Sequence, residues 1–174
     1  MIHVCSLARL HDTVETSGAS HVVTLINSAT EVVRPASIVP ENHLFLGMND
    51  IISPREGMVL PGEAHVARLL EFVTAWPGEK PIGLHCWAGI SRSTAAGFIT
   101  LCARHPEIDE EAAALHLRSL SPTATPNGRL VALADAMLGR GGRMTRAVEA
   151  IGRGAFAGEG DPFMLDPAFG AQRG

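Results

Sequence analysis

One short segment, residues 85–93, constrains the fold more than any other part of the chain. It reads His-Cys-Trp-Ala-Gly-Ile-Ser-Arg-Ser and places a cysteine and an arginine six positions apart. The apolar run 81–84 precedes it, and the small-residue stretch 94–99 follows it. This order predicts a strand, a tight loop and a helix. Cys86 would lie at the end of the strand and Arg92 at the start of the helix.

The residue types of this segment suit the capture of a tetrahedral dianion. Successive backbone N–H groups of a curled loop can form an anion-binding nest, and a helix N-terminus adds partial positive charge. Gly89 permits a backbone conformation that a side chain would forbid, and the guanidinium of Arg92 can hold two phosphate oxygens at once. Because cations and helix N-termini favour thiolates, we expect Cys86 to be a nucleophile at neutral pH.

Two neighbours of the thiol complete this prediction. Ser93 can donate a hydrogen bond to the sulfur of Cys86, which would make the sulfur a better leaving group. His85 can fix the loop or tune the thiol. The alternative is a purely structural turn, with Cys86 buried and Arg92 in a surface ion pair. The histidine, glycine and serine at these positions favour the catalytic interpretation.

The run His-Cys-x-x-Gly-x-x-Arg-Ser resembles the signature loop of the cysteine-dependent protein tyrosine phosphatase superfamily. The residues Ala-Gly-Ile-Ser-Arg-Ser within it are similar to those of the dual-specificity branch and of compact bacterial relatives. The strong match covers residues 81–104, and a looser match of layout extends to about residue 150. The resemblance implies a phosphate-binding loop of the CX5R type (a P-loop). It also implies hydrolysis through a phosphocysteine intermediate, without metal or other cofactor. The implied phosphate-binding residues are Trp87, Ala88, Gly89, Ile90, Ser91 and Arg92.

The resemblance also implies an aspartic acid on a mobile upstream loop, which protonates the leaving oxygen. Asp50 lies 36 residues before Cys86 and follows the apolar run 43–48. A loop rich in proline and glycine comes next, as expected for a segment that closes over a substrate. The alternative for Asp50 is a residue that caps its own loop. Glu56, on the same loop, is the nearest competitor.

Other polar residues have a mainly structural interpretation. Asn127 is the candidate for placing the hydrolytic water, but it is more readily the N-cap of a helix over 129–138. Asp109 is predicted to cap a helix, and Asp12 and Asp135 are also interpreted as structural. The basic cluster Arg140, Arg143 and Arg146 is interpreted as a helix end with a solvated face, with a substrate-docking patch as the alternative.

The apolar pattern predicts an α/β chain with a central, mostly parallel sheet of about four to five strands flanked by helices and a helical C-terminal half. Predicted strands cover 1–5, 21–26, 43–48 and 82–86. Predicted helices cover 7–14, 63–76, 92–104, 109–120, 127–138 and 143–151. We expect one phosphatase-like catalytic domain over 1–151 and a Gly/Pro-rich tail over 152–174 that docks in part.

Composition and charge restrict the classes of binding partner and the cellular compartment that we expect. The net charge of −4 argues against general nucleic-acid binding. No apolar stretch approaches the roughly 20 residues that span a bilayer, so no membrane association is expected. The chain shows no secretory signal, and three cysteines do not suggest a disulfide framework, which favours a cytoplasmic location. The eight histidines show no metal-ligand spacing, so no metal site is predicted.

The variable positions of the loop bear on the substrate. None is basic, whereas relatives that act on polyphosphorylated inositol lipids carry cations there, so the sequence favours a phosphoprotein or a small phosphomonoester. Phosphotyrosine is the first expectation, with phosphoserine and phosphothreonine left open, because the chain has no tyrosine to line a deep pocket. Trp87 is either an aromatic wall of the site or a core residue.

Two other function classes stay open. The first is a phosphoprotein-binding module that keeps the fold but turns over poorly. The second is an arsenate- or sulfur-handling enzyme with a similar anion loop, which would need Cys5 or Cys102 to approach Cys86.

Overall fold

The computed structural model describes residues 1–170. Its centre is a five-stranded sheet in the order β3-β2-β4-β1-β5. The strands are β1 (Ile2–Ser6), β2 (His21–Ile26), β3 (His43–Gly47), β4 (Ile82–Cys86) and β5 (Phe163–Leu165). The first four strands are parallel to one another, whereas β5 is antiparallel to β1. The predicted fold class, an α/β chain with a mostly parallel sheet, is confirmed.

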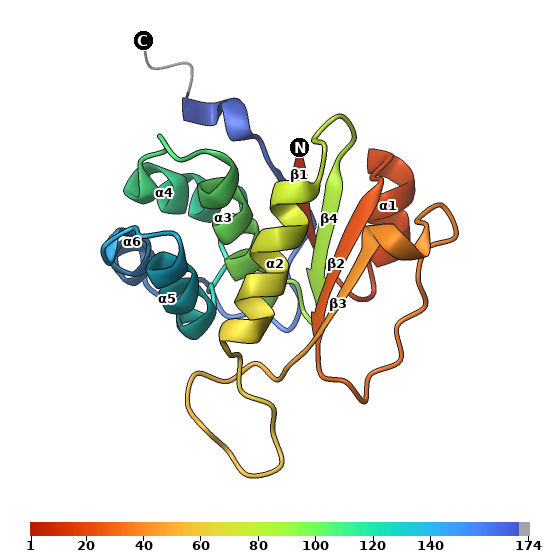
Figure 1. Ribbon diagram of the computed structural model, residues 1–174, viewed down its shortest axis with the longest axis horizontal. Helices are drawn as coiled ribbons and strands as arrows, with labels where there is room; N and C mark the ends of the chain where they lie inside the picture. Colours follow the sequence, from red (N-terminus) through yellow and green to blue (C-terminus); the bar gives the residue numbers. More distant parts are fainter. Residues whose placement is uncertain (171–174) are drawn as a thin grey trace.

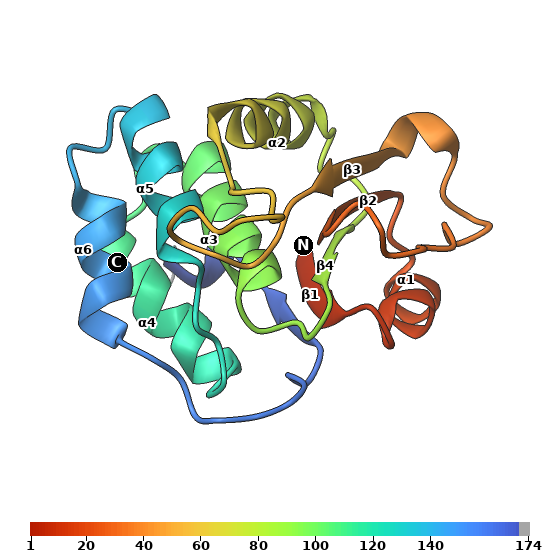
Figure 2. The ribbon, with the colours of Figure 1, turned by 90° about the horizontal axis from the view of Figure 1, so that it is seen from below.

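Helices cover the two faces of the sheet unequally (Figures 1 and 2). They are α1 (Leu10–Ser17), α2 (Glu63–Ala75), α3 (Arg92–Arg104), α4 (Glu110–Leu120), α5 (Gly128–Met137) and α6 (Arg143–Ile151), with short 3-10 helices at Pro40–Asn42 and Pro167–Gly170. Helix α1 lies alone on one face. Helices α2 and α3 pack on the other face, and α4, α5 and α6 form a further layer beyond α3.

Two apolar clusters follow from the alternation of side chains along the strands. Val22 of β2 joins the smaller cluster under α1, whereas Val23 faces the larger cluster under α3. Helix α3 is buried on nearly every side because it lies between the sheet and the outer helices. Its Gly97 has no space for a side chain: a Cβ there would lie 3.0 Å from both Val4 Cγ2 and Leu165 Cδ1. This close approach lets the middle of α3 lie directly on the sheet.

The first helix differs from its prediction. It was expected over 7–14, but it begins at Leu10 and ends at Ser17, where Gly18 adopts a left-handed conformation (φ 67°). The reason lies in the preceding residues. Residues 7–9 form a tight turn instead, in which Arg9 N donates to Ser6 O and Leu10 N to Leu7 O, both at 3.2 Å, while Leu7 N donates to Trp87 O of the β4–α3 loop.

The basic cluster also differs from its interpretation as a solvated face. Arg140 is buried, and its guanidinium pairs with the buried carboxylate of Glu110 at 2.9 Å. It also donates to three backbone carbonyls in the last turn of α3 and just after it, at Cys102, His105 and Pro106. Arg143, which is half-exposed, shares Glu110. Arg140 therefore joins α3, α4 and the start of α6 from inside the molecule.

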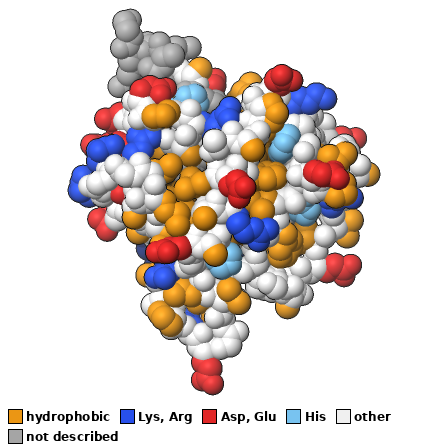
Figure 3. Space-filling model, viewed as in Figure 1, with side chains coloured by type: hydrophobic (Ala, Val, Ile, Leu, Met, Phe, Trp, Pro, Cys, Tyr) orange, Lys and Arg blue, Asp and Glu red, His pale blue; other side chains and the backbone are white. Residues whose placement is uncertain are grey.

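Two surface properties complete the description. Acidic and basic side chains are interspersed over the described part of the face drawn in Figure 3. Within residues 1–170, no helix combines the length and the apolar character that crossing a membrane requires.

Candidate active site

The predicted nucleophile lies at the centre of the parallel strands. Cys86 is the last residue of β4, and β4 lies between β1 and β2. The chain leaves β1 toward α1 on one face and leaves β4 toward α3 on the other. Ligands of open α/β sheets bind at such a point, beyond the carboxyl ends of the strands.

The loop that follows Cys86 curls tightly against β1. Gly89 has a φ of +73°, in the left-handed region where glycine carries no steric penalty. A Cβ on Gly89 would lie 2.8 Å from the backbone N of Ser6 and 2.9 Å from the carbonyl carbon of Cys5. Both the dihedral angle and the close approach therefore require glycine at this position, as the sequence predicts.

Hydrogen bonds from outside the loop hold four of its carbonyl groups. The four bonds run from Leu7 N to Trp87 O at 3.2 Å, from Gly160 N to Ala88 O at 2.9 Å, from Thr125 N to Ile90 O at 2.9 Å and from Asn127 N to Ser91 O at 3.2 Å. A peptide unit is planar, with its C=O and N–H groups pointing in opposite directions. Holding these carbonyls outward therefore turns the N–H groups of the following residues inward.

The inward N–H groups are free to bind an anion. No described acceptor takes a hydrogen bond from the backbone N–H groups of residues 87–92. Consecutive free N–H groups in front of a helix N-terminus form an anion-binding concavity. The geometry of the loop is compatible with the predicted nest, and anion binding by it stays a prediction.

Ser93 lies beside the thiol. Its Oγ is 3.2 Å from the Sγ of Cys86, and both side chains are buried. The other two thiols are also buried and free. Cys5 is paired in register with His85 and so faces α1, opposite to Cys86. Cys102 lies in the core on α3. The structure thus does not bring either thiol into the loop.

The guanidinium of Arg92 is held at the floor of the site. Arg92 is 6% exposed, and its Nη1 donates to the carbonyl of Met48 at 2.8 Å. Its Nε is buried, and no described residue accepts a hydrogen bond from it. A buried cationic donor without a partner is costly, and a bound oxyanion would satisfy it.

Asp50 reaches the loop from the carboxyl side of β3. Its Oδ1 accepts from Ser91 Oγ at 2.8 Å and from Asn127 Nδ2 at 2.8 Å. The loop that begins with Asp50 is closed at its base, where Asn49 N donates to Val59 O and Val59 N to Asn49 Oδ1. Three separately predicted residues, Asp50, Ser91 and Asn127, are therefore in direct contact.

Asn127 is the N-cap of α5, the role that the sequence favours, and its side chain also contacts Asp50. Its Oδ1 accepts from the backbone N–H groups of Arg129 and Leu130, both at 3.1 Å, and so caps α5. Its amide nitrogen faces the other way and donates to Asp50. The helix cap thus positions a donor on the candidate acid.

His85 points away from the thiol, toward the α1 face of the sheet. Its Nε2 lies 2.7 Å from Thr24 Oγ1, and the same hydroxyl is 2.8 Å from His43 Nε2. Burial lowers the pKa of His85 to about 4, so the ring is neutral near pH 7. Its place is that of a residue that fixes the end of β4.

These side chains surround a pocket of about 330 Å³. Its lining residues are Asn27, Asp50, Cys86, Trp87, Ala88, Ile90, Ser91 and Arg92. Trp87 is 62% exposed, which decides between the two interpretations of this residue: it is not in the core. Sequence reasoning missed Asn27. Its position directly after β2, next to β4 in the sheet, was a signal that could have found it.

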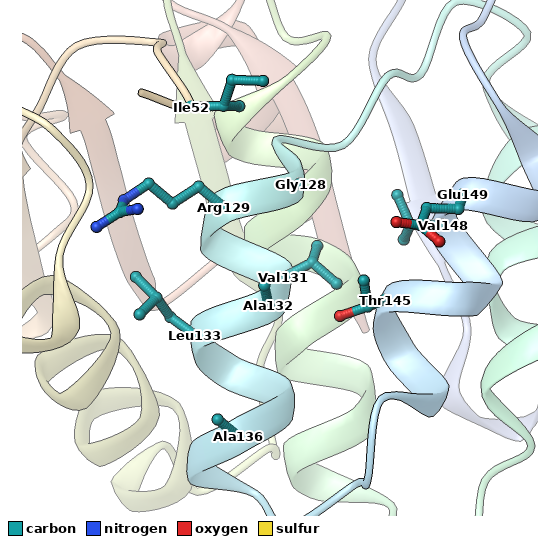
Figure 4. Close-up of a pocket in the computed structure, with 10 residues that line it drawn as sticks. All are labelled: Ile52, Gly128, Arg129, Val131, Ala132, Leu133, Ala136, Thr145, Val148 and Glu149. Carbon is teal, nitrogen blue, oxygen red and sulfur yellow. The ribbon is translucent and has the colours of Figure 1, made fainter. Parts of the chain in front are cut away.

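A second hollow, of about 420 Å³, lies beside α5 and α6 (Figure 4). Its walls come from α5 and α6, with Ile52 at one end. The lining is mainly aliphatic and contains no cysteine.

Comparisons with known proteins agree on the architecture. No protein-family model and no curated protein matches the sequence. Among solved structures, DUSP15 is 15% identical to this chain, with a TM-score of 0.63. The match covers 91% of this chain and 94% of the DUSP15 chain. The Cydia pomonella PTP-2 phosphatase is 20% identical with a TM-score of 0.60 (78% and 84% covered). A human tyrosine phosphatase-like serine/threonine/tyrosine-interacting protein is 14% identical with a TM-score of 0.61 (80% and 91% covered).

Proposed function

We propose that this chain, which has the fold of the cysteine-dependent protein tyrosine phosphatases, hydrolyses phosphomonoesters through a phosphocysteine intermediate. The proposed substrate is a phosphoprotein, with phosphotyrosine first and phosphoserine and phosphothreonine also within reach of the site. The single observation that supports it most is the array of inward N–H groups around Cys86, with the buried Nε of Arg92 beside it.

In the first step the thiolate of Cys86 attacks phosphorus. The bond between phosphorus and the leaving oxygen breaks, and Asp50 gives its proton to that oxygen. The N–H groups of residues 87–92 and the guanidinium of Arg92 bind the equatorial oxygens, on which negative charge is concentrated. General acid assistance of this kind contributes about 10²–10⁴-fold to a rate.

In the second step a water molecule attacks the phosphocysteine. The carboxylate of Asp50 takes a proton from the water, the S–P bond breaks, and inorganic phosphate leaves. The hydroxyl of Ser93, 3.2 Å from Sγ, stabilises the departing thiolate by donating a hydrogen bond. Neither step needs a metal ion, so we expect full activity in the presence of a chelator.

The hydrogen bonds of Asp50 support its role. Ser91 and Asn127 both donate to Oδ1, and no described residue donates to Oδ2. Oδ2 is therefore the oxygen that carries the proton. Glu56, the competing acid, has no contact with the pocket lining among the described hydrogen bonds, so Asp50 is the better assignment.

The lining of the pocket supports the substrate class. Arg92 is its one cationic residue, and the variable positions of the loop are apolar or hydroxylated. A single guanidinium matches one phosphate group, whereas a polyphosphorylated headgroup would need further cations. The exposed indole of Trp87 at the pocket supplies an aromatic surface for the ring of a phosphotyrosine.

The test is hydrolysis of an aryl phosphate between pH 4 and 9 by the wild type and three variants. We expect Cys86→Ser to abolish activity and Asp50→Asn to lower kcat by about 10²–10⁴-fold with loss of the basic limb of the pH profile. Glu56→Gln, the matched control on the same loop, should retain wild-type kcat. Phosphatase activity in Cys86→Ser would overturn the proposal. Tight binding of phosphopeptides without release of phosphate would replace it with the binding-module alternative.

A further inference from the structure

The segment between α6 and β5, residues 152–162, crosses beside the phosphate-binding loop. We call it the strap. It carries no regular secondary structure, and Figure 2 shows it running from α6 past the β4–α3 connection to the edge of the sheet. The proposed reaction assigns it no part, although it forms one of the four outer hydrogen bonds of the loop.

Both ends of the strap are fixed. At the α6 end, Ala155 N donates to Pro122 O at 2.8 Å and Gly154 N to Thr125 Oγ1 at 3.0 Å. At the other end, β5 pairs with β1, and Leu165 is fully buried in the core. Because Thr125 itself holds the carbonyl of Ile90, the first anchor is also a support of the loop.

Between these anchors Gly160 lies directly against the loop. Its N–H donates to Ala88 O at 2.9 Å. A Cβ on Gly160 would lie 3.1 Å from Gly89 O, 3.2 Å from Thr123 Oγ1 and 3.3 Å from Ile90 Cγ1. These distances are tighter than ordinary van der Waals contact, so any side chain at residue 160 would push on the loop.

The preceding residue forms a second contact at the end of β1. The carboxylate of Glu159 accepts from Ser6 Oγ at 2.5 Å, and Ser6 is fully buried. Ser6 is paired in register with Cys86, and its backbone N is the atom that a Cβ on Gly89 would approach most closely. Glu159 therefore holds the strand end on which the loop rests.

We propose that Gly160 and Glu159 are positioning residues for oxyanion binding by the loop, an inference that rests on the proposed phosphatase function. The Ala88–Gly89 peptide is one planar unit, so the bond from Gly160 to Ala88 O keeps the N–H of Gly89 aimed at the anion. The strap thus acts through the orientation of a single peptide plane. Without it, that plane can rotate and place a carbonyl oxygen toward the phosphate.

The experiment compares Gly160→Ala with Gly158→Ala, since a Cβ on Gly158 meets no atom within 4 Å. Orthovanadate affinity is measured by calorimetry, and kcat and KM with an aryl phosphate. We expect Gly160→Ala to weaken vanadate binding and lower kcat by about fivefold, the equivalent of one hydrogen bond of about 1 kcal/mol. Gly158→Ala should match the wild type, and hydrogen exchange of residues 87–92 in the vanadate-bound protein should be faster only in Gly160→Ala.

A second pair of variants keeps the test valid if Gly160→Ala fails to fold. Glu159→Ala should weaken vanadate binding by about threefold, and Glu159→Gln, which retains an oxygen that can accept from Ser6, should restore it. Equal vanadate affinity in all variants would overturn the inference while leaving the phosphatase proposal intact. Vanadate binding without turnover in the wild type would overturn the phosphatase proposal alone, and the Gly160 comparison would still decide the role of the strap. A wild type that binds no oxyanion would overturn both.

Discussion

At the scale of single residues, Asn127 links the stability of a helix to the position of the candidate acid. Its side-chain oxygen caps α5, while its nitrogen donates to Asp50. A serine at this position can still cap the helix, because its hydroxyl accepts from the same N–H groups, but it cannot reach the carboxylate with an amide donor.

We therefore expect Asn127→Ser and Asn127→Ala to separate the two roles. Both variants should lower kcat by about 13-fold, since a hydrogen bond to a charged group is worth about 1.5 kcal/mol. Only Asn127→Ala should lower the free energy of unfolding, by about 1 kcal/mol. Steady-state kinetics and urea unfolding of both variants check this. Wild-type kcat in Asn127→Ser would show that the contact with Asp50 has no part in catalysis.

The three thiols give a second prediction at this scale. Burial raises the pKa of Cys5 to about 11 and that of Cys102 to about 12, so both are protonated thiols at neutral pH. Iodoacetamide at pH 7 should modify Cys86 alone, because the thiolate is the reactive form. Mass spectrometry of the native protein measures the label, and Cys86→Ser should take up none. Labelling of Cys5 at the rate of Cys86 would contradict the prediction.

At the scale of elements, α6 depends on a carboxylate from its neighbour α5. Asp135 is buried, and its two oxygens accept from the backbone N–H groups of Gly142 at 2.6 Å, Met144 at 2.7 Å and Thr145 at 3.1 Å. These are the donors that a helix N-terminus leaves without partners. The carboxylate also complements the positive end of the helix dipole.

Asp135→Ala should therefore lower the free energy of unfolding by about 2 kcal/mol, at the upper end of the range for helix caps. Asp135→Asn, which keeps one acceptor oxygen, should lose less. Asp12→Ala is the control, because Asp12 forms an exposed pair with Arg9 and such pairs contribute about 0–1 kcal/mol. Urea unfolding measures all three. Equal stability of Asp135→Ala and Asp12→Ala would contradict the assignment of Asp135 as the cap.

The elements also show what a sequence can predict. The strand, loop and helix around Cys86 follow from a local pattern, because the residues that form the nest are consecutive. The contacts that support the loop from outside cannot be predicted from a local pattern. Gly160 and Arg140 act on partners far away in the chain, and neither has a neighbour in sequence that indicates this. Arg140 in particular resembles any basic residue at a helix end, and only the buried Glu110 opposite it reveals its role.

At the scale of the whole molecule, stability should depend on pH through one buried and four partly buried histidines. Burial lowers the pKa values of five of them, His3, His21, His43, His85 and His116. A histidine whose pKa is lower in the folded state binds protons more readily when unfolded. Its contribution to stability is complete above the unfolded pKa of about 6.5 and is lost as the pH falls toward the folded value.

We expect the free energy of unfolding to be constant near neutral pH and to fall below pH 6.5. For His85, whose folded pKa is about 4, the loss reaches about 3 kcal/mol at pH 4. Urea unfolding at pH 7, 5.5 and 4.5 measures this, and His85→Asn should give a flatter profile than the wild type. A wild-type stability that rises between pH 6.5 and 4.5 would contradict the assignment.

The hydrogen bond between Gly160 and Ala88 has a consequence for the timing of synthesis. The donor follows the acceptor by 72 residues, which a ribosome adds in about 4–14 s at about 5–20 residues per second. During that interval β1, β4 and the loop are already present, but the peptide between Ala88 and Gly89 has no outer support. The nascent chain thus carries Cys86 before the peptide plane of Ala88 and Gly89 has its outer support, and we expect oxyanion binding to reach full strength only when residue 160 has emerged and docked.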